Sequence, residues 1–120
     1  MHRFTRAQRL TEASEFSALF KGRETQRAGD ALITILARPN GLGRPRLGFA
    51  VGRKAVPRAV GRNRIKRQAR ELFRNQQAEL PALDFLVMAR PPAAAADRGR
   101  LRDSLDRHLT KVAERCAGSS

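Results

Sequence analysis

The sequence predicts an α/β (α+β) fold, a two-layer sandwich of a small mixed sheet and about three helices in the order helix–strands–helix–strand–helix. Apolar residues recur at helical spacing in three segments, at about 11–22, 59–77 and 97–116. Short β-rich apolar runs lie between these segments. The chain has 120 residues, which suffice for one hydrophobic core and not for two. A single domain is therefore expected over residues 1–120, with its core at about 9–116.

The N-terminal part is expected to be a basic arm followed by a helix. Residues 1–10 form the arm, and this arm and the tail at 117–120 are predicted to be flexible. Thr11 is a suitable N-cap, and glutamates follow in the first turn, where the helix dipole favours acids. Phe16 and Phe20 share one face of this helix.

The strands are predicted from short apolar runs bounded by turn formers. Residues 31–37 are β-rich and nearly all apolar, which favours a strand covered on at least one side. A loop rich in Gly and Pro at 39–45 separates them from a second strand at 47–51, most simply a hairpin partner of the first. A third strand is expected at 85–89, and the alanines at 93–96 are interpreted as a linker to the last helix.

The segment at 59–77 is predicted to be an amphipathic helix with a cationic face. Its apolar stripe consists of Ile65, Ala69, Leu72 and Phe73. The opposite arc holds Arg64, Lys66, Arg67, Arg70 and Arg74, with Arg62 at its edge. Residues 44–74 contain eleven Lys or Arg and one acid, so they carry most of the net charge of +14. Solvated charge runs usually mix signs, and this one does not, so it indicates a surface that binds a polyanion.

Other functional classes find little support in the sequence. The single cysteine, Cys116, cannot form an internal disulfide or a zinc site alone. No apolar run could span a bilayer, and the N-terminus lacks the apolar core of a signal peptide. Acid–base cleavage of RNA would need two converging imidazoles, and the chain offers His2 in the arm and His108 in the last helix. The eleven acids are scattered. We therefore expect a cytoplasmic protein with no catalytic residues, no metal site and no membrane contact.

The chain resembles the family of bacterial ribonuclease P protein subunits, and more closely the proteobacterial form. The resemblance is based on Arg46-Leu47-Gly48-Phe49-Ala50-Val51, Arg53-Lys54, Ala59-Val60-Gly61-Arg62-Asn63-Arg64-Ile65-Lys66-Arg67 and Arg70-Glu71. It covers about residues 9–113. The resemblance implies an α/β sandwich with a left-handed crossover, which physical rules would not predict because right-handed crossovers dominate.

The resemblance also implies a function. The family's enzyme hydrolyses one phosphodiester bond to remove the 5′ leader from precursor tRNA, and its catalytic subunit is an RNA that holds Mg²⁺ at the scissile phosphate. The protein would bind the catalytic RNA and the leader, raise substrate affinity and let magnesium sites fill at lower ion concentration. Its expected partners are therefore the ribonuclease P RNA and precursor tRNA, with no obligate protein partner.

Site residues follow from the resemblance position by position. The expected contacts to the catalytic RNA are Arg62, Asn63, Arg64, Lys66, Arg67 and Arg70. The expected leader cleft, between the first helix and the sheet, comprises Phe16, Phe20, Thr34, Ala50, Gly52, Arg53, Lys54 and Arg90. Many relatives have an aromatic at the position of Thr34 and Ser or Thr at that of Ala50. Since base–aromatic stacking is worth ~1–3 kcal/mol per base, leader binding is expected to be weaker here or to shift to the two phenylalanines.

Alternative interpretations remain open. Phe16 and Phe20 also suit an ordinary core face, and Arg62 could cap the basic helix or pair with an acid. A purely structural RNA-binding protein, such as a ribosomal component, would have the same composition. A DNA-binding protein that reads sequence with residues 59–77 is less favoured, because no helix and short turn precede that segment.

Overall fold

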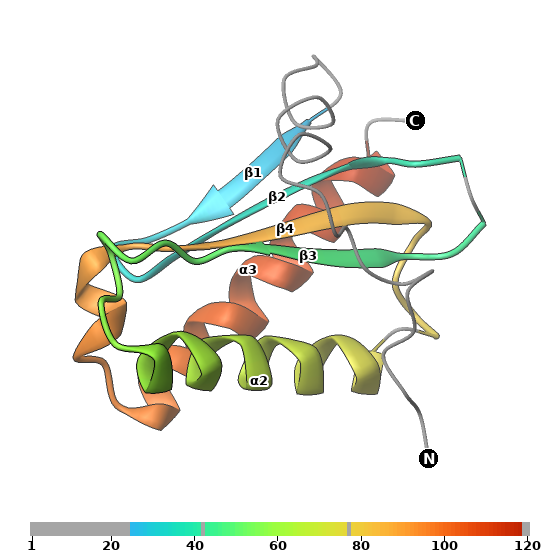
Figure 1. Cartoon of the computed structure of the whole chain (residues 1–120). Helices are drawn as coiled ribbons and strands as arrows, with labels where there is room; N and C mark the ends of the chain where they lie inside the picture. Colours follow the sequence, from blue (N-terminus) through green and yellow to red (C-terminus); the bar gives the residue numbers. More distant parts are fainter. Residues whose placement is uncertain (1–24, 42, 77, 119–120) are drawn as a thin grey trace.

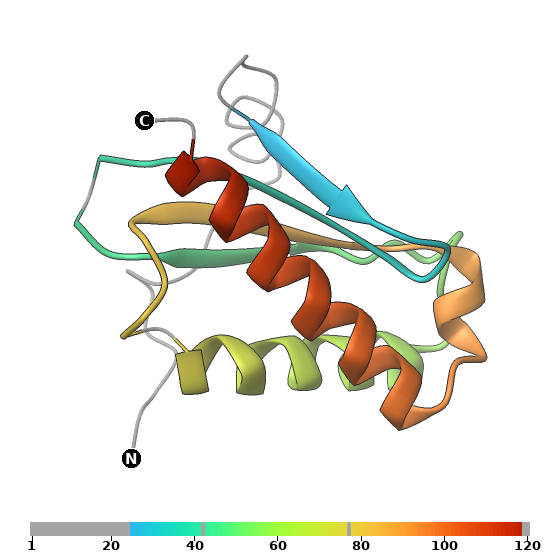
Figure 2. The same ribbon diagram turned by 180° about the vertical axis from the view of Figure 1, so that it is seen from behind.

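The computed structural model describes residues 25–41, 43–76 and 78–118, which form a mixed sheet with helices on one face (Figures 1 and 2). The strands are β1 (Gln26–Gly29), β2 (Ile33–Pro39), β3 (Arg46–Ala50) and β4 (Leu83–Ala89). The helices are α2 (Ala59–Gln76), the short 3₁₀ helix η2 (Pro91–Ala94) and α3 (Arg98–Gly118). The predicted arm at 1–10 and first helix at 11–22 lie outside the described residues.

The strand order is β1-β2-β4-β3, and this order corrects the predicted pairing. β2 pairs antiparallel with β1 and β4, and β3 pairs parallel with β4. The predicted hairpin of the strands at 31–37 and 47–51 is therefore wrong, because β4 lies between them. Every residue of β4 from Leu83 to Val87 is buried, which suits a strand with a neighbour on each side. The turn residues at 39–45 are compatible with a tight hairpin and equally with a connection that passes one strand.

The structure differs from the sequence analysis at three further places. β1 was not predicted, because four residues with alternate exposure carry almost no periodic signal. The alanines at 93–96 are not a plain linker, since η2 includes two of them and Ala93 and Ala96 are buried. Pro91 suits the first turn of a helix, where its missing N–H is not needed. α3 continues to Gly118, two residues beyond the predicted end of the last helix.

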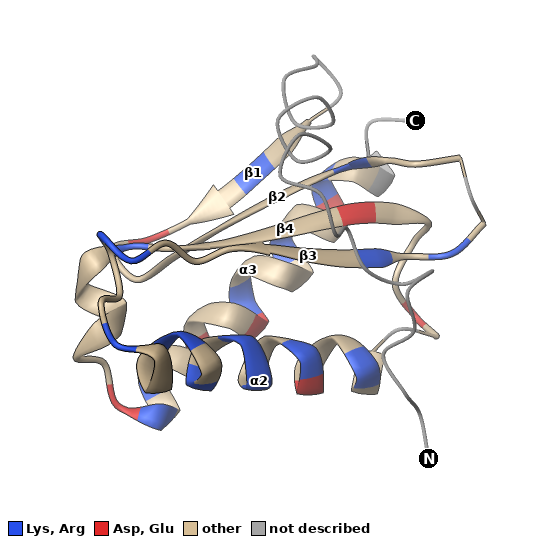
Figure 3. Ribbon diagram, in the orientation of Figure 1, with Lys and Arg blue, Asp and Glu red and all other residues tan. Residues whose placement is uncertain are grey.

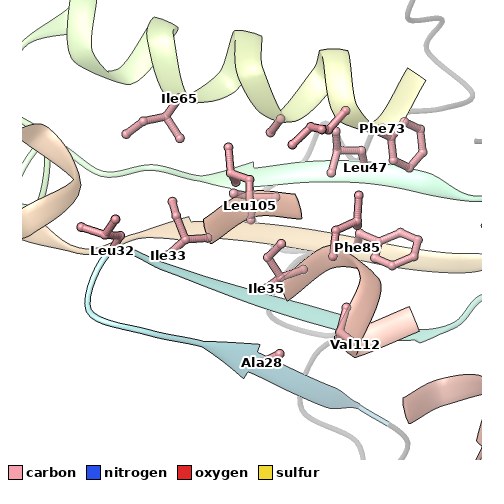
Figure 4. Close-up of a cluster of buried hydrophobic side chains, with 14 of the residues drawn as sticks. Ala28, Leu32, Ile33, Ile35, Leu47, Ile65, Phe73, Phe85, Leu105 and Val112 are labelled. Carbon is pink, nitrogen blue, oxygen red and sulfur yellow. The ribbon is translucent and has the colours of Figure 1, made fainter. Parts of the chain in front are cut away.

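The core lies between the sheet and the two α-helices (Figure 4). The predicted stripe of α2 is buried as expected, as are Leu101, Leu105, Leu109 and Val112 of α3. Phe73 of α2 meets Phe85 of β4 edge to face, with ring centroids 6.2 Å apart. This packing fixes the buried side of α2 and thereby directs the opposite side outward.

A polar cluster ties the turn between β1 and β2 to α3. The Asp30 carboxylate accepts hydrogen bonds from the Leu32 and Ile33 amides, at 2.8 and 3.1 Å, and from the Ser104 hydroxyl. Burial raises the pKa of Asp30, but these hydrogen bonds and the nearby His108 outweigh it, so the pKa is lowered. His108 is buried, with Nδ1 2.7 Å from the Ser104 carbonyl oxygen, so this histidine has a structural role.

Candidate nucleic-acid interface

Basic residues recur along α2, where they are coloured blue in Figure 3, and those outside its buried stripe are exposed or half-buried. Asn63, Arg67 and Arg74 are exposed, and Lys66 is half-buried. The first turn of α2 contains no acid, so no carboxylate of the helix offsets the charge there. Glu71 is the acid within α2, and its partner is Arg102 of α3 at 3.6 Å. The helix therefore offers a cationic surface to which phosphate groups can bind.

Arg62 has a structural contact in addition to its predicted role. Its Nη1 donates to the carbonyl oxygens of Val56 and Pro57, at 3.0 and 2.8 Å. Val56 is buried and its Cγ1 lies 2.9 Å from where a Cβ on Gly61 would be. A larger residue at that position would push the loop away from the helix. Arg62 and Gly61 together hold the loop that precedes α2 against its first turn.

Arg64 and Arg70 also contact other parts of the protein. The Nη2 of Arg64 donates to the Ala93 carbonyl oxygen at 3.2 Å, which links α2 to η2. The guanidinium carbon of Arg70 lies 5.2 Å from the centre of the Phe49 ring, a cation–π geometry. The six residues predicted to bind RNA therefore share one helix, but Arg62, Arg64 and Arg70 also stabilise its surroundings.

A groove runs between α2 and the beginning of α3. Its volume is about 420 Å³, and its lining consists of Val60, Asn63, Arg64, Arg67, Gln68 and Glu71 of α2 and Arg98 of α3. Gln68 was missed by the sequence analysis. The available signal was its position, because a glutamine three residues after Ile65 and four before Leu72 falls on the buried stripe.

The predicted leader-binding residues gather around the other face of the sheet. Thr34 of β2 and Ala50 of β3 are both register partners of Met88 in β4, so the three lie in one row across the sheet. Their neighbours Ile33 and Val87 point into the core on the helix side, so this row faces away from the helices. Thr34 is buried, Ala50 is exposed and Met88 is 36% exposed.

The remaining leader-binding residues lie at the end of this row. Arg90 follows β4, and its Nε donates to Thr34 Oγ1 at 3.4 Å. Gly52, Arg53 and Lys54 form the exposed turn directly after β3. The structure thus brings together six of the eight predicted residues, while Phe16 and Phe20 lie outside the described residues. The row and the cationic face of α2 lie on opposite sides of the sheet.

The same sheet face contains a buried ion pair at the start of β3 and β4, four residues before Ala50 and Met88. Arg46 of β3 binds Asp84 of β4 through two hydrogen bonds, Nε to Oδ1 at 2.7 Å and Nη2 to Oδ2 at 2.8 Å. The Asn40 side-chain amide donates to the same Oδ1 at 3.0 Å. Asp84 is fully buried, and its partners fix the edge strand β3 and the loop before it.

Within residues 25–41, 43–76 and 78–118, no group of three or more His, Cys, Asp or Glu is arranged to hold a metal ion. None of the helices described there has both the length and the apolar character to cross a membrane.

Comparisons with known proteins agree on one family. The family model described as Ribonuclease P matches residues 4–113. The chain is 45% identical over 117 residues to a "Ribonuclease P protein component" of Methylococcus capsulatus, covering 98% of this chain and 90% of that protein. It is 48% identical over 104 residues to one from an Escherichia coli strain, covering 87% and 86%.

Solved structures agree with the sequence relatives. The RNase P protein of Staphylococcus aureus superimposes with a TM-score of 0.79 at 28% identity, over 88% of this chain and 95% of that one. The RNase P protein of Thermotoga maritima gives a TM-score of 0.70 at 30% identity, over 88% and 96%. The α+β fold with its four-stranded mixed sheet is thus similar to RNase P proteins from two other bacteria.

Proposed function

The chain belongs to the ribonuclease P protein family, and we propose which of its surfaces serve the two RNAs of that reaction. As a ribonuclease P protein component, it is a subunit of an endoribonuclease that processes the 5′ leader of tRNA, and the family implies association with the ribonuclease P RNA. The observation that carries the proposal is the separation of two surfaces, a cationic helix on one side of the sheet and a mostly uncharged strand row on the other.

The outward side of α2 would dock on the catalytic RNA. Arg67 and Asn63 are exposed, and Lys66 lies between them, so phosphates could approach all three without displacing a protein contact. Arg62, Arg64 and Arg70 would add their charge from positions already fixed by protein contacts. A pre-ordered guanidinium loses less conformational freedom on binding than a mobile one.

The row around Thr34, Ala50 and Arg90 would hold the single-stranded leader of precursor tRNA, with Phe16 and Phe20 as the expected stacking residues. The proposal is supported by the strand register, which aligns Thr34 and Ala50, and by the hydrogen bond from Arg90 to Thr34. Gly52, Arg53 and Lys54 would contact the leader backbone from the turn at the end of the row. Because Thr34 is buried beside Arg90, its hydroxyl would act mainly by orienting that guanidinium.

Mg²⁺ would stay with the RNA subunit, as the family resemblance implies. The protein would help magnesium sites to fill by neutralising nearby phosphates. We place this assembly in the cytoplasm, and we expect the crossover from β3 through α2 to β4 to be left-handed, as in the family. The polypeptide alone would not cleave RNA.

The test is cleavage of a precursor tRNA by this protein mixed with the ribonuclease P RNA of Escherichia coli, the organism of a 48% identical relative, at low magnesium. Each component is also tested alone. We expect cleavage at the mature 5′ end in the mixture. Tight RNA binding without stimulated cleavage would favour a structural RNA-binding protein, and cleavage by the protein alone would contradict the assignment of catalysis to RNA.

One substitution tests each surface, Arg67→Ala for the catalytic RNA and Phe20→Ala for the leader. Arg67→Ala should weaken binding to the catalytic RNA and lower the salt dependence of log K by about 0.7–0.9, the contribution of one phosphate contact. Lys111→Ala removes the same charge from an exposed position on α3 and should leave the slope unchanged. Phe20→Ala should weaken binding of precursor tRNA more than binding of mature tRNA. An equal loss with both tRNAs would indicate a core role for Phe20.

A further inference from the structure

Gln68 is a buried polar side chain that lines the groove between α2 and α3. It is 5% exposed, and both its amide nitrogen and its amide oxygen are buried without a hydrogen-bond partner among the described residues. Buried polar groups are nearly always hydrogen-bonded, because leaving them unpaired costs free energy. Because Gln68 also lines the groove, a ligand that enters the groove is a candidate partner for its amide.

The groove has the size and chemistry of a nucleotide site. Its volume of about 420 Å³ lies within the range of ~300–1,000 Å³ for small-ligand pockets. Arg67 of α2 and Arg98 of α3 both line the groove, and guanidinium groups of this kind bind phosphate. Val60 is 79% exposed, which leaves an apolar surface free for the face of a base. The Nε of Arg64 is a further buried donor without a partner among the described residues.

A base fits Gln68 better than a lone anion does. Phosphate oxygens accept hydrogen bonds, so a phosphate beside Gln68 would satisfy the amide nitrogen and leave the amide oxygen facing another acceptor. The carboxylate of Glu71, which also lines the groove, would repel it. The edge of a nucleobase presents a donor and an acceptor side by side, and a planar side-chain amide matches that pair.

We propose that this groove receives one unpaired nucleotide of the catalytic RNA, with the Gln68 amide hydrogen-bonded to the edge of its base and Arg67 and Arg98 facing its phosphates. Proteins commonly read RNA through unstacked bases in this manner. The inference rests on the proposed docking of α2 to the catalytic RNA. It adds a base-reading contact to a helix otherwise expected to bind phosphates without regard to sequence.

The test compares Gln68→Met with Arg67→Ala in the full-length protein bound to the Escherichia coli ribonuclease P RNA. Methionine keeps the length and unbranched shape of glutamine and removes both polar atoms. We expect Gln68→Met to weaken RNA binding about tenfold with an unchanged salt slope, because it removes no phosphate contact. Its melting temperature should equal or exceed that of the original protein, since an unpaired buried amide is lost.

Chemical probing of base edges in the bound RNA gives the second measurement. The original protein should protect one unpaired base that remains reactive with Gln68→Met bound. Gln68→Leu is the second variant, so that a folding defect in one substitution does not decide the result. Saturating Arg67→Ala should still protect this base, although the salt dependence of its RNA binding is lower.

The outcomes separate the two proposals. If Arg67→Ala lowers the salt slope, but both Gln68 variants bind as tightly as the original and protect the same bases, the base-reading site is overturned and the docking face stands. If the original protein does not bind the RNA, or Arg67→Ala leaves the slope unchanged, the docking of α2 is itself overturned. Loss of the protected base in both Gln68 variants supports the base-reading site.

Discussion

Arg62 and Arg67 carry the same charge on the same helix, but the structure predicts that only the replacement of Arg62 destabilises the fold. Arg67 is exposed, whereas Nη1 of Arg62 donates to two carbonyl oxygens of the preceding loop. A hydrogen bond from a charged group contributes ~1.5–3 kcal/mol, and we take the low end because one of the two bonds is exposed. Arg62→Ala should therefore lower the free energy of unfolding by about 1.5 kcal/mol, or the melting temperature by roughly 6 °C for a domain of this size.

The assay is thermal unfolding of the two variants and the original protein, followed by circular dichroism at low and high salt. Each variant removes one positive charge from a chain of net charge +14, so relief of charge repulsion is similar in both and cancels in their comparison. We expect Arg67→Ala to melt within about 2 °C of the original protein, as exposed substitutions usually do. Equal melting temperatures for the two variants would refute the structural role of Arg62.

Three further substitutions test the described fold. Because the pKa of Asp30 is lowered in the folded protein, its carboxylate stabilises the fold above pH 3.8, and this contribution is lost as the pH falls through the lower folded value. Asp30→Asn should therefore be less stable than the original protein in urea denaturation at pH 7, and the difference should shrink progressively below pH 3.8. Gly29→Ala should cost ~1–3 kcal/mol, since the new Cβ would lie 2.7 Å from the backbone oxygen of Ile33; unchanged stability would contradict that contact. Phe73→Ala, at a side chain 1% exposed, should cost ~3–5 kcal/mol by calorimetry, whereas exposed Asn75→Ala should change stability by less than about 0.5 kcal/mol.

Local pattern predicted α2 and α3 well. The stripe that begins at Ile65 is buried as its spacing required, and the helix predicted at 59–77 is observed over Ala59–Gln76. The last helix was expected from about residue 97, and it begins at Arg98 with the Asp97 carboxylate accepting a hydrogen bond from the Arg100 amide. Helices are predictable in this way because each turn repeats the same relation between sequence and burial.

Strand pairing was not predictable from the same kind of pattern. The nearly all apolar run at 31–37 indicates that a strand is buried, but it carries no information on which strand lies beside it. The deciding contact here is nonlocal, since Asp84 of β4 binds Arg46 of β3 across a separation of 38 residues. The charged pair and the parallel register Arg46↔Asp84 favour placing β3 next to β4, with β4 between β2 and β3.

The candidate site shows the same division between local and nonlocal information. The cationic face of α2 follows from composition and helical spacing, both of which can be read from sequence. The groove at Gln68 needs the position of Arg98, which only the packing of α3 supplies. The row from Thr34 to Ala50 likewise depends on Met88 between them, so the resemblance indicated its members before the sheet order could explain why they are close.

The way the arginines are held explains how so basic a helix can be ordered and still attract RNA. Arg46 is fixed by the carboxylate of Asp84, which cancels its charge. Arg62 and Arg64 are fixed instead by backbone carbonyl oxygens, of Val56 and Pro57 and of Ala93, which orient a guanidinium without neutralising it. The side chains at the base of α2 therefore keep their full positive charge while losing much of their conformational freedom. An ordered, unneutralised cation attracts phosphate at long range and loses little entropy when the phosphate arrives, so the contacts that stabilise the helix also prepare it to bind RNA.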